Sequence, residues 1–147
     1  MINKVLIVVP PLVNLDEGSA SDQPEYEAFR LVSPVEPTTV AADLLKRGFQ
    51  VKLFDLGTYF FKGRFEHLER ALETFRPEAV VVVQSILTFS TAQDWDGKRV
   101  FDLAQTYCPG AVRVLTGSHA TNYPGQAVQA GLCEYSIRGE VDFAVGE

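Results

Sequence analysis

Cysteine and histidine are both scarce in this chain, with two of each among 147 residues. Cys108 and Cys133 stand far apart, and neither belongs to a C-x-x-C pair, so the sequence contains no zinc or disulfide framework. His67 and His119 form no H-x-x-x-H or similar metal pair. With only two thiols, the chain cannot supply three cysteine ligands to a four-iron, four-sulfur cluster. These absences favour two reduced, structural cysteines.

Basic residues are also few: the chain has 13 Lys and Arg but 19 Asp and Glu, which gives a net charge of −6. Nucleic-acid binding needs clustered cations to neutralise phosphates, so we expect no nucleic-acid partner. Apolar runs such as Val80–Val83 are far too short to cross a bilayer. The apolar run Val5–Leu12 contains two prolines and has no small-residue cleavage site after it, so it does not predict a signal peptide. We therefore expect a cytoplasmic protein without membrane contact.

Several common functional motifs are missing. No G-x-G-x-x-G fingerprint and no G-x-x-x-x-G-K-[ST] loop are present, so the two best-known phosphate-binding patterns are excluded. No G-x-S-x-G elbow is present either. A phospho-acceptor receiver domain has paired acidic residues after its first strand, whereas this chain has Pro10-Pro11 there.

What the chain does have is a regular alternation of short apolar runs and amphipathic segments, within a composition that is 46% hydrophobic and 22% charged. This composition and length suit one soluble domain. The apolar or alternating runs predict strands, and the 3.6-residue patterns predict helices. The expected strands are 4–9, 50–55, 79–83, 111–115 and 134–137. One helix is expected to begin near Glu36-Pro37. Three further helices are expected over 65–75, 96–107 and 123–130.

Such alternation indicates an α/β domain with right-handed crossovers. We expect a flavodoxin-like (Rossmann-like) five-stranded parallel sheet with helices on both faces and strand order 2-1-3-4-5. In such sheets, ligands bind outside the carboxyl ends of the strands. The loops expected at this edge are 10–36, 84–90, 116–123 and 138–140. Those after the third and fourth strands are rich in glycine and hydroxyl residues, which allow close approach and hydrogen bonding to a large flat ligand.

The order of the pieces resembles a known family. Its elements in this chain are Lys4–Pro11, Thr39–Val51, Phe75–Val81, Ser85–Thr88, Val114–Thr121 and Tyr135–Glu140. Together they resemble the N-terminal cobalamin-binding domain of cobalamin-dependent radical S-adenosylmethionine enzymes, which include methyltransferases and the anaerobic ring cyclases of tetrapyrrole synthesis. The resemblance covers essentially the whole chain.

The resemblance implies where the cofactor binds. Ser85-x-Leu87 resembles the S-x-L element, whose serine lies beside the nucleotide tail. Gly117-Ser118-His119 resembles a G-G-x-H element in which Ser118 replaces the second glycine. Pro10-Pro11-Leu12 would line the corrin side. The full set of implied cofactor-binding residues is Pro10, Pro11, Leu12, Ser85, Ile86, Leu87, Thr88, Gly117, Ser118, His119, Ala120, Gly139 and Glu140.

The resemblance also implies the form of the cofactor. The D-x-H-x-x-G motif, which supplies a histidine below cobalt, is absent, so cobalamin is expected base-off without a histidine lower ligand. The cluster motif C-x-x-x-C-x-x-C is absent as well. We therefore expect the iron–sulfur cluster and S-adenosylmethionine to belong to a C-terminal radical domain of the same protein. The chain would then be an N-terminal fragment that is not catalytic alone, and its last residues would begin a further helix.

Other interpretations remain open at this point. Ser85 and Thr88 could cap the following helix, and His119 could be an ordinary loop histidine. The domain could be a vestigial scaffold that no longer binds cobalamin and docks a substrate or partner domain. It could also be an unrelated flavodoxin-like enzyme or nucleotide-binding protein, since a fold alone does not settle function.

Overall fold

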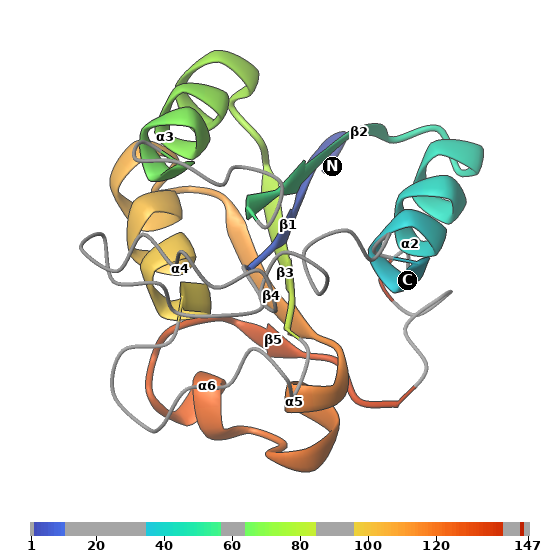
Figure 1. Cartoon of the computed structure of the whole chain (residues 1–147), viewed down its shortest axis with the longest axis vertical. Coiled ribbons are helices and arrows are strands. Elements are labelled where there is room, and N and C mark those ends of the chain that lie inside the picture. The colour runs from blue at the N-terminus through green and yellow to red at the C-terminus, as the bar shows by residue number, and fades with distance from the viewer. Residues whose placement is uncertain (1, 11–34, 57–63, 85–95, 140–144, 146–147) are drawn as a thin grey trace, which may run out of the picture.

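A computed structural model describes residues 2–10, 35–56, 64–84, 96–139 and 145. These residues form five parallel strands and five helices, arranged in three layers (Figure 1). The strands are β1 (Lys4–Val9), β2 (Gln50–Asp55), β3 (Ala79–Val83), β4 (Val112–Thr116) and β5 (Tyr135–Ser136). The helices are α2 (Val35–Lys46), α3 (Arg64–Phe75), α4 (Asp96–Tyr107), α5 (Ser118–Asn122) and α6 (Gln126–Gln129).

The sheet has the order β2-β1-β3-β4-β5, which confirms the predicted flavodoxin-like arrangement. Strand β3 occupies the centre, and all five of its residues are buried. A central parallel strand is covered on both faces, so an uninterrupted run of Ala and Val is the composition that suits it. The edge strand β2 is more exposed and keeps a polar residue, Lys52, among its apolar ones.

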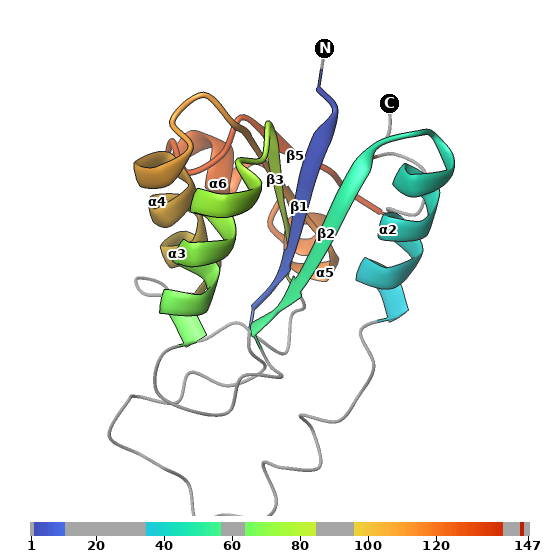
Figure 2. The ribbon, with the colours of Figure 1, turned by 90° about the horizontal axis from the view of Figure 1, so that it is seen from above.

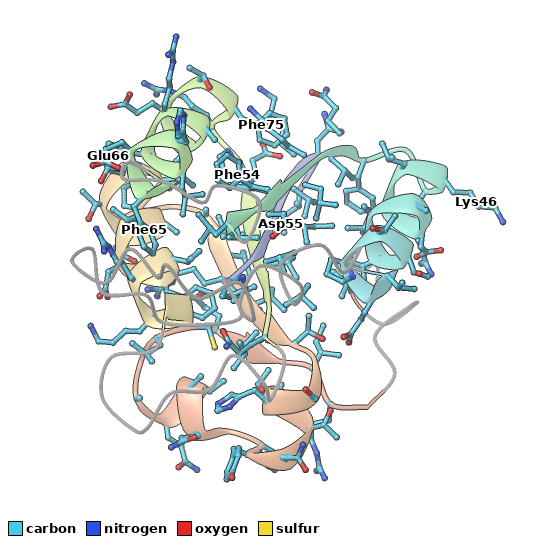
Figure 3. All side chains as sticks on the ribbon, in the orientation of Figure 1. Lys46, Phe54, Asp55, Phe65, Glu66 and Phe75 are labelled. Atoms are coloured by element: carbon cyan, nitrogen blue, oxygen red, sulfur yellow. The ribbon has the colours of Figure 1, made fainter. Side chains whose placement is uncertain are left out.

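Two apolar clusters lie on the two faces of the sheet, because successive residues of a strand point to opposite sides. On one face, α3 and α4 pack over residues such as Leu6, Val80 and Leu115. Phe54 and Phe65 belong to this cluster, and Phe75 packs against it (Figure 3). On the other face, α2 packs over Ile7 and Val81. Figure 2 shows α2 on one side of the sheet and α3 and α4 on the other.

Helix α2 shows how the sequence sets this packing. Its buried residues Val40, Ala41 and Leu44 recur at helical spacing and form its contribution to the core. Lys46 lies in its last turn, where a cation interacts favourably with the helix dipole, and points away from the sheet (Figure 3). Gly48 follows with φ of +92°, a conformation that glycine adopts readily and that ends the helix.

The amino edge of the sheet is held by two carboxylates. Glu78, just before β3, accepts hydrogen bonds from the backbone N–H groups of Asn3 (2.6 Å) and Lys4 (3.1 Å). Glu134, just before β5, accepts a bond from the backbone N–H of Arg113 (2.6 Å) and pairs with its guanidinium. The bonds from Asn3 and Lys4 lower the pKa of Glu78, and those from Arg113 lower the pKa of Glu134.

Two strands differ slightly in their bounds from the sequence prediction, and one predicted helix is only partly present. Strand β4 both begins and ends one residue later than predicted, and β5 is shorter at both ends. The predicted helix over 123–130 is present only as the short α6, because a turn through Tyr123 and Pro124 precedes it and separates it from α5, which was not predicted. Pro124 lacks the N–H that a continuing helix needs, and Gly125 has a left-handed φ of +81°. As a result Ser118, His119 and Ala120 lie in a short helix, where a loop was expected.

Candidate functional site at the carboxyl edge of the sheet

Polar side chains are rare in the interior of the described chain, and they gather at one place. Gln84 and Thr116 have no exposed surface, and His119 is 2% exposed. Gln84 directly follows β3, Thr116 ends β4, and His119 lies in the first turn of α5. Burial of polar groups is costly unless they make hydrogen bonds or serve a purpose. Their grouping makes this edge the candidate functional site.

Main-chain hydrogen bonds hold the ends of β3 and β4 together. The backbone N–H of Gln84 donates to the carbonyl oxygen of Thr116 (2.9 Å). The carbonyl oxygen of Gln84 in turn accepts from the backbone N–H of His119 (3.1 Å). These two bonds extend the pairing of the strands beyond the register pair Val83 and Thr116. The segment after β4 is therefore fixed against the end of β3.

Gly117 makes this close approach possible. Its φ of +97° and ψ of −171° fall in a region that only glycine populates readily. A Cβ on Gly117 would lie 2.6 Å from the carbonyl oxygen of Gln84, a distance that real Cβ atoms do not reach. The glycine predicted for this site from the sequence thus has both a conformational and a steric reason to be glycine.

Thr121 connects the segment after β5 to the same place. Its hydroxyl donates to the carbonyl oxygen of Gly117 (3.1 Å). The same hydroxyl accepts a bond from the backbone N–H of Gly139 (2.9 Å). Gly117 and Gly139, which the resemblance assigned to one binding site, are therefore linked through one side chain.

His119 is held in an apolar setting. Its ring lies against that of Tyr123, with 5.3 Å between ring centroids and 35° between ring planes. Burial lowers the pKa of the imidazole, so the ring is neutral at pH 7. Tyr123 itself is half-exposed. A buried, neutral imidazole behaves as a packing element more than as a surface ligand.

Two hydroxyl oxygens are buried without a hydrogen-bond partner in the described part of the chain. They are Oγ1 of Thr116 and Oγ of Ser136. Thr116 is paired in register with Val83 and lies on the face covered by α2. Ser136 is paired with Leu115 and lies on the face covered by α3 and α4. The two hydroxyls therefore lie on different faces of the sheet.

The structure describes about half of the predicted site residues. Gly117, Ala120 and Pro10 are buried, Ser118 is half-buried and Gly139 is exposed, all near the ends of the strands or in α5. The other predicted residues lie outside the described residues: Pro11, Leu12, Ser85, Ile86, Leu87, Thr88 and Glu140.

Three residues of this edge belong to the loops predicted to bind a ligand but were not among the named cofactor-binding residues: Gln84, Thr116 and Thr121. Gln84 and Thr116 are each the first polar residue after an apolar run, which is a recognisable signal for a strand that reaches a polar site. Thr121 has no such signal, because its importance depends on contacts with Gly117 and Gly139 that no local pattern encodes.

Metal ligands do not cluster in the part of the chain that the structure covers. No group of three or more His, Cys, Asp or Glu side chains there could hold a metal ion. Within the same residues, every helix is too short or too polar to cross a membrane.

Comparisons with known proteins add little. No protein-family model matches the chain, and no curated protein matches it. Among solved structures, the receiver domain of NtrC4 from Aquifex aeolicus is similar over 98% of this chain and 88% of that chain, with 15% sequence identity and a TM-score of 0.48. So distant a likeness says nothing about function, and the fold assignment follows from the strand order itself.

Proposed function

We propose that this chain is a cobalamin-binding domain, the cofactor module of a cobalamin-dependent radical S-adenosylmethionine enzyme such as a methyltransferase or an anaerobic cyclase. The observation that carries the proposal is the contact of Gly117 with the carbonyl of Gln84. It brings the segment after β4 against Gln84, the residue that directly follows β3, with no side chain between them. That is the edge at which open parallel sheets bind ligands.

The residues present fit a large cofactor. Ser118, which is half-buried, and Gly139, which is exposed, have a small side chain or none, so a flat ring could approach the backbone closely there. The buried hydroxyl of Thr116 offers a hydrogen-bonding group with no protein partner in the described chain. Pro10 ends β1 beside this edge, and Ser85–Thr88 follow directly after Gln84. When bound, cobalamin would supply a cobalt centre that can accept and pass on a methyl group; the protein's task is to bind and orient it.

We propose the base-off form, with no histidine bound to cobalt. The loop after β1, where the D-x-H-x-x-G motif would place a histidine, contains none. His119, in α5, has 2% of its surface exposed and packs on Tyr123. The iron–sulfur chemistry would come from a C-terminal radical domain of the same protein.

A titration with hydroxocobalamin, followed by absorbance and gel filtration, tests the proposal. We expect the corrinoid to co-elute with the protein and to show a base-off spectrum. Ser85→Tyr should abolish the complex by filling the space of the nucleotide tail. Thr74→Tyr adds the same bulk at an exposed position of α3, near the opposite edge, and should bind as the unchanged chain does. Elution of the corrinoid apart from the protein at every concentration would contradict the proposal.

A corrinoid-free scaffold is the second candidate, and one observation favours it. The main-chain bonds among Gln84, Thr116 and His119 give Gly117 a purely structural reason to exist. A scaffold would have the same melting temperature with and without hydroxocobalamin. A binding domain would melt at a higher temperature with the ligand, because ligand binding to the native state alone stabilises it.

A further inference from the structure

Helix α2 has a second apolar face, which is exposed to solvent. Val35 is 72% exposed and Leu45 is 56% exposed, and Thr38 and Ala42 between them are exposed as well. At 3.6 residues per turn, these four positions fall within a band about 80° wide on the helix. The buried residues of α2 lie on another side, where the helix packs mainly on β1 and β2. We call the four exposed residues the α2 stripe.

The long helices on the other face of the sheet have no such stripe. Every residue of α3 and α4 described as exposed is polar or charged, for example Arg70, Glu73 and Asp102. Next to α2, Leu53 of the edge strand β2 is 36% exposed, and it lies on the face of α2 because it pairs with Ile7. Single exposed apolar residues are ordinary, whereas a continuous apolar patch marks an interaction surface.

The α2 stripe is complementary to a second copy of itself. If two α2 helices pack antiparallel about a two-fold axis at the level of Val40, Val35 of each copy lies opposite Leu45 of the other. Thr38 of each copy then lies opposite Ala42 of the other, because both pairs are centred on residue 40. The small residues at the centre allow the two helix axes to approach to about 8–10 Å. Such a contact uses the same surface on both copies, as two-fold dimers do.

The charges at the two ends of α2 favour the same arrangement. The first turn contains the acidic Glu36 and the last turn the basic Lys46, which points away from the sheet (Figure 3). Arg47 follows and pairs with Asp43 at 2.7 Å, so the carboxyl end of the helix keeps the positive charge of Lys46. Antiparallel packing brings the acidic end of each helix beside the basic end of the other, whereas parallel packing brings like charges together.

We propose that the α2 stripe is a homodimer interface, on which the α2 helix of a second copy packs antiparallel. This inference does not depend on the cofactor. A helix of 12 residues is about 18 Å long. One such helix from each copy gives an interface at the small end of the range, roughly 1,200 Å² or less. We therefore expect a reversible dimer with a dissociation constant of roughly 10–100 µM.

Sedimentation velocity at concentrations from roughly 5 to 500 µM measures the dissociation constant on both sides of the expected value. Ala42→Glu should weaken the dimer by at least about tenfold, because it places a charge at the centre of the contact. The variant should keep its helix, since glutamate is a good helix former and can pair with Lys46 four residues later. Ala130→Glu makes the same change at an exposed alanine after α6 and should dimerise as the unchanged chain does.

A charge exchange tests the orientation of the two helices. Glu36→Lys and Lys46→Glu should each weaken the dimer roughly threefold, the effect of an exposed charge pair. The double variant should restore the affinity of the unchanged chain. Glu36→Lys replaces −1 by +1 and so changes the net charge from −6 to −4. This change lowers the general repulsion between two copies, so a weaker dimer can only reflect the local pairing.

Three outcomes contradict the inference. A chain that stays monomeric at every concentration leaves the α2 stripe to a different partner, such as another domain. Equal dimerisation by Ala42→Glu and Ala130→Glu places the contact between copies elsewhere on the molecule. A dimer that Ala42→Glu weakens, but that neither single charge variant affects, does not have the antiparallel packing. Melting curves at the lowest concentration show that each variant is folded.

Discussion

At the scale of single residues, the conformation of Gly117 explains how the segment after β4 packs against Gln84 at the end of β3. Its positive φ, and the 2.6 Å that would separate an added Cβ from the carbonyl oxygen of Gln84, would each penalise any other residue. The sequence pattern led to this glycine, but it placed Gln84 and Thr116 only in ligand-binding loops and gave neither residue a role of its own. A polar residue at the end of an apolar run reveals that the strand ends there; it does not reveal which buried atoms will lack partners.

Replacement of Gly117 by alanine should destabilise the protein by about 3 kcal/mol, because a residue with a Cβ is strained in this backbone region. The melting temperature should fall by roughly 6–12 °C for a domain of this size. Gly110→Ala is the control, since a Cβ there meets nothing within 4 Å and the backbone has no positive φ. Equal melting temperatures for the two variants would contradict the steric argument.

The thiol of Cys133 should be unreactive in the folded protein. It is buried, and burial raises its pKa to about 11, so the thiolate that reacts with disulfide reagents is scarce at pH 8. Cys108 is half-buried and should react first, although burial raises its pKa as well. A dithiobis-nitrobenzoate assay should count one thiol in the native protein and two after addition of denaturant. Two fast-reacting thiols in the native state would show that Cys133 is accessible.

At the scale of elements, apolar periodicity predicted most of the architecture. Strands β1, β2 and β3 and helix α4 have the predicted bounds, because each combines a clear repeat with a proline, glycine or polar boundary. The region from Ser118 to Gln129 was harder. Its two helices are four and five residues long, which is too short for a 3.6-residue repeat to be recognised. There, Pro124 and Gly125 indicate the break between the two helices, which the apolar pattern does not show.

Helix α3 should contribute to stability mainly through Leu72, which has no exposed surface and packs in the cluster beneath α3 and α4. Leu72→Ala should lower the free energy of unfolding by about 2–5 kcal/mol through lost burial and a residual cavity. Leu45→Ala on α2 makes the same change at a residue that is 56% exposed and should cost within about 0.5 kcal/mol.

Urea unfolding of both variants checks this difference, with a lower midpoint for Leu72→Ala and an unchanged slope. Similar midpoints for the two variants would mean that α3 is not packed on the sheet in the way described.

At the scale of the whole molecule, the two edges of the sheet have different chemistry. The carboxyl edge collects buried polar groups and glycine, whereas the amino edge is held by Glu78 and Glu134. The chain has a net charge of −6, so carboxylates that bind N–H groups and a guanidinium also place part of the negative charge where it is stabilised.

The amino edge should make stability depend on pH. The pKa of each of these carboxyl groups is lowered from its ordinary value of 4.5 in the folded state. Their contribution is therefore fully present above about pH 4.5 and is lost as the pH falls through the lower folded values. Glu78→Gln and Glu134→Gln should each be less stable than the unchanged chain at pH 7 and should approach it at pH 3.

Urea unfolding at several pH values measures this convergence. Glu66→Gln is the control, because Glu66 lies exposed in the first turn of α3, far from the amino edge (Figure 3). Its curve should keep the pH dependence of the unchanged chain. Parallel curves for all three variants would exclude the two carboxylates as the source of acid sensitivity.

The position of β1 between β2 and β3 has a consequence for how the chain folds during synthesis. Strand β1 is made first, yet one of its two partners is β3, and the hydrogen bond from Asn3 to Glu78 spans 75 residues. Pairing across such a separation requires closure of a long loop, which slows folding. While the ribosome is still adding β3, β1 can pair only with β2, so one hydrogen-bonding edge of an apolar strand stays open. Nascent chains at this stage are the ones that should bind chaperones most strongly.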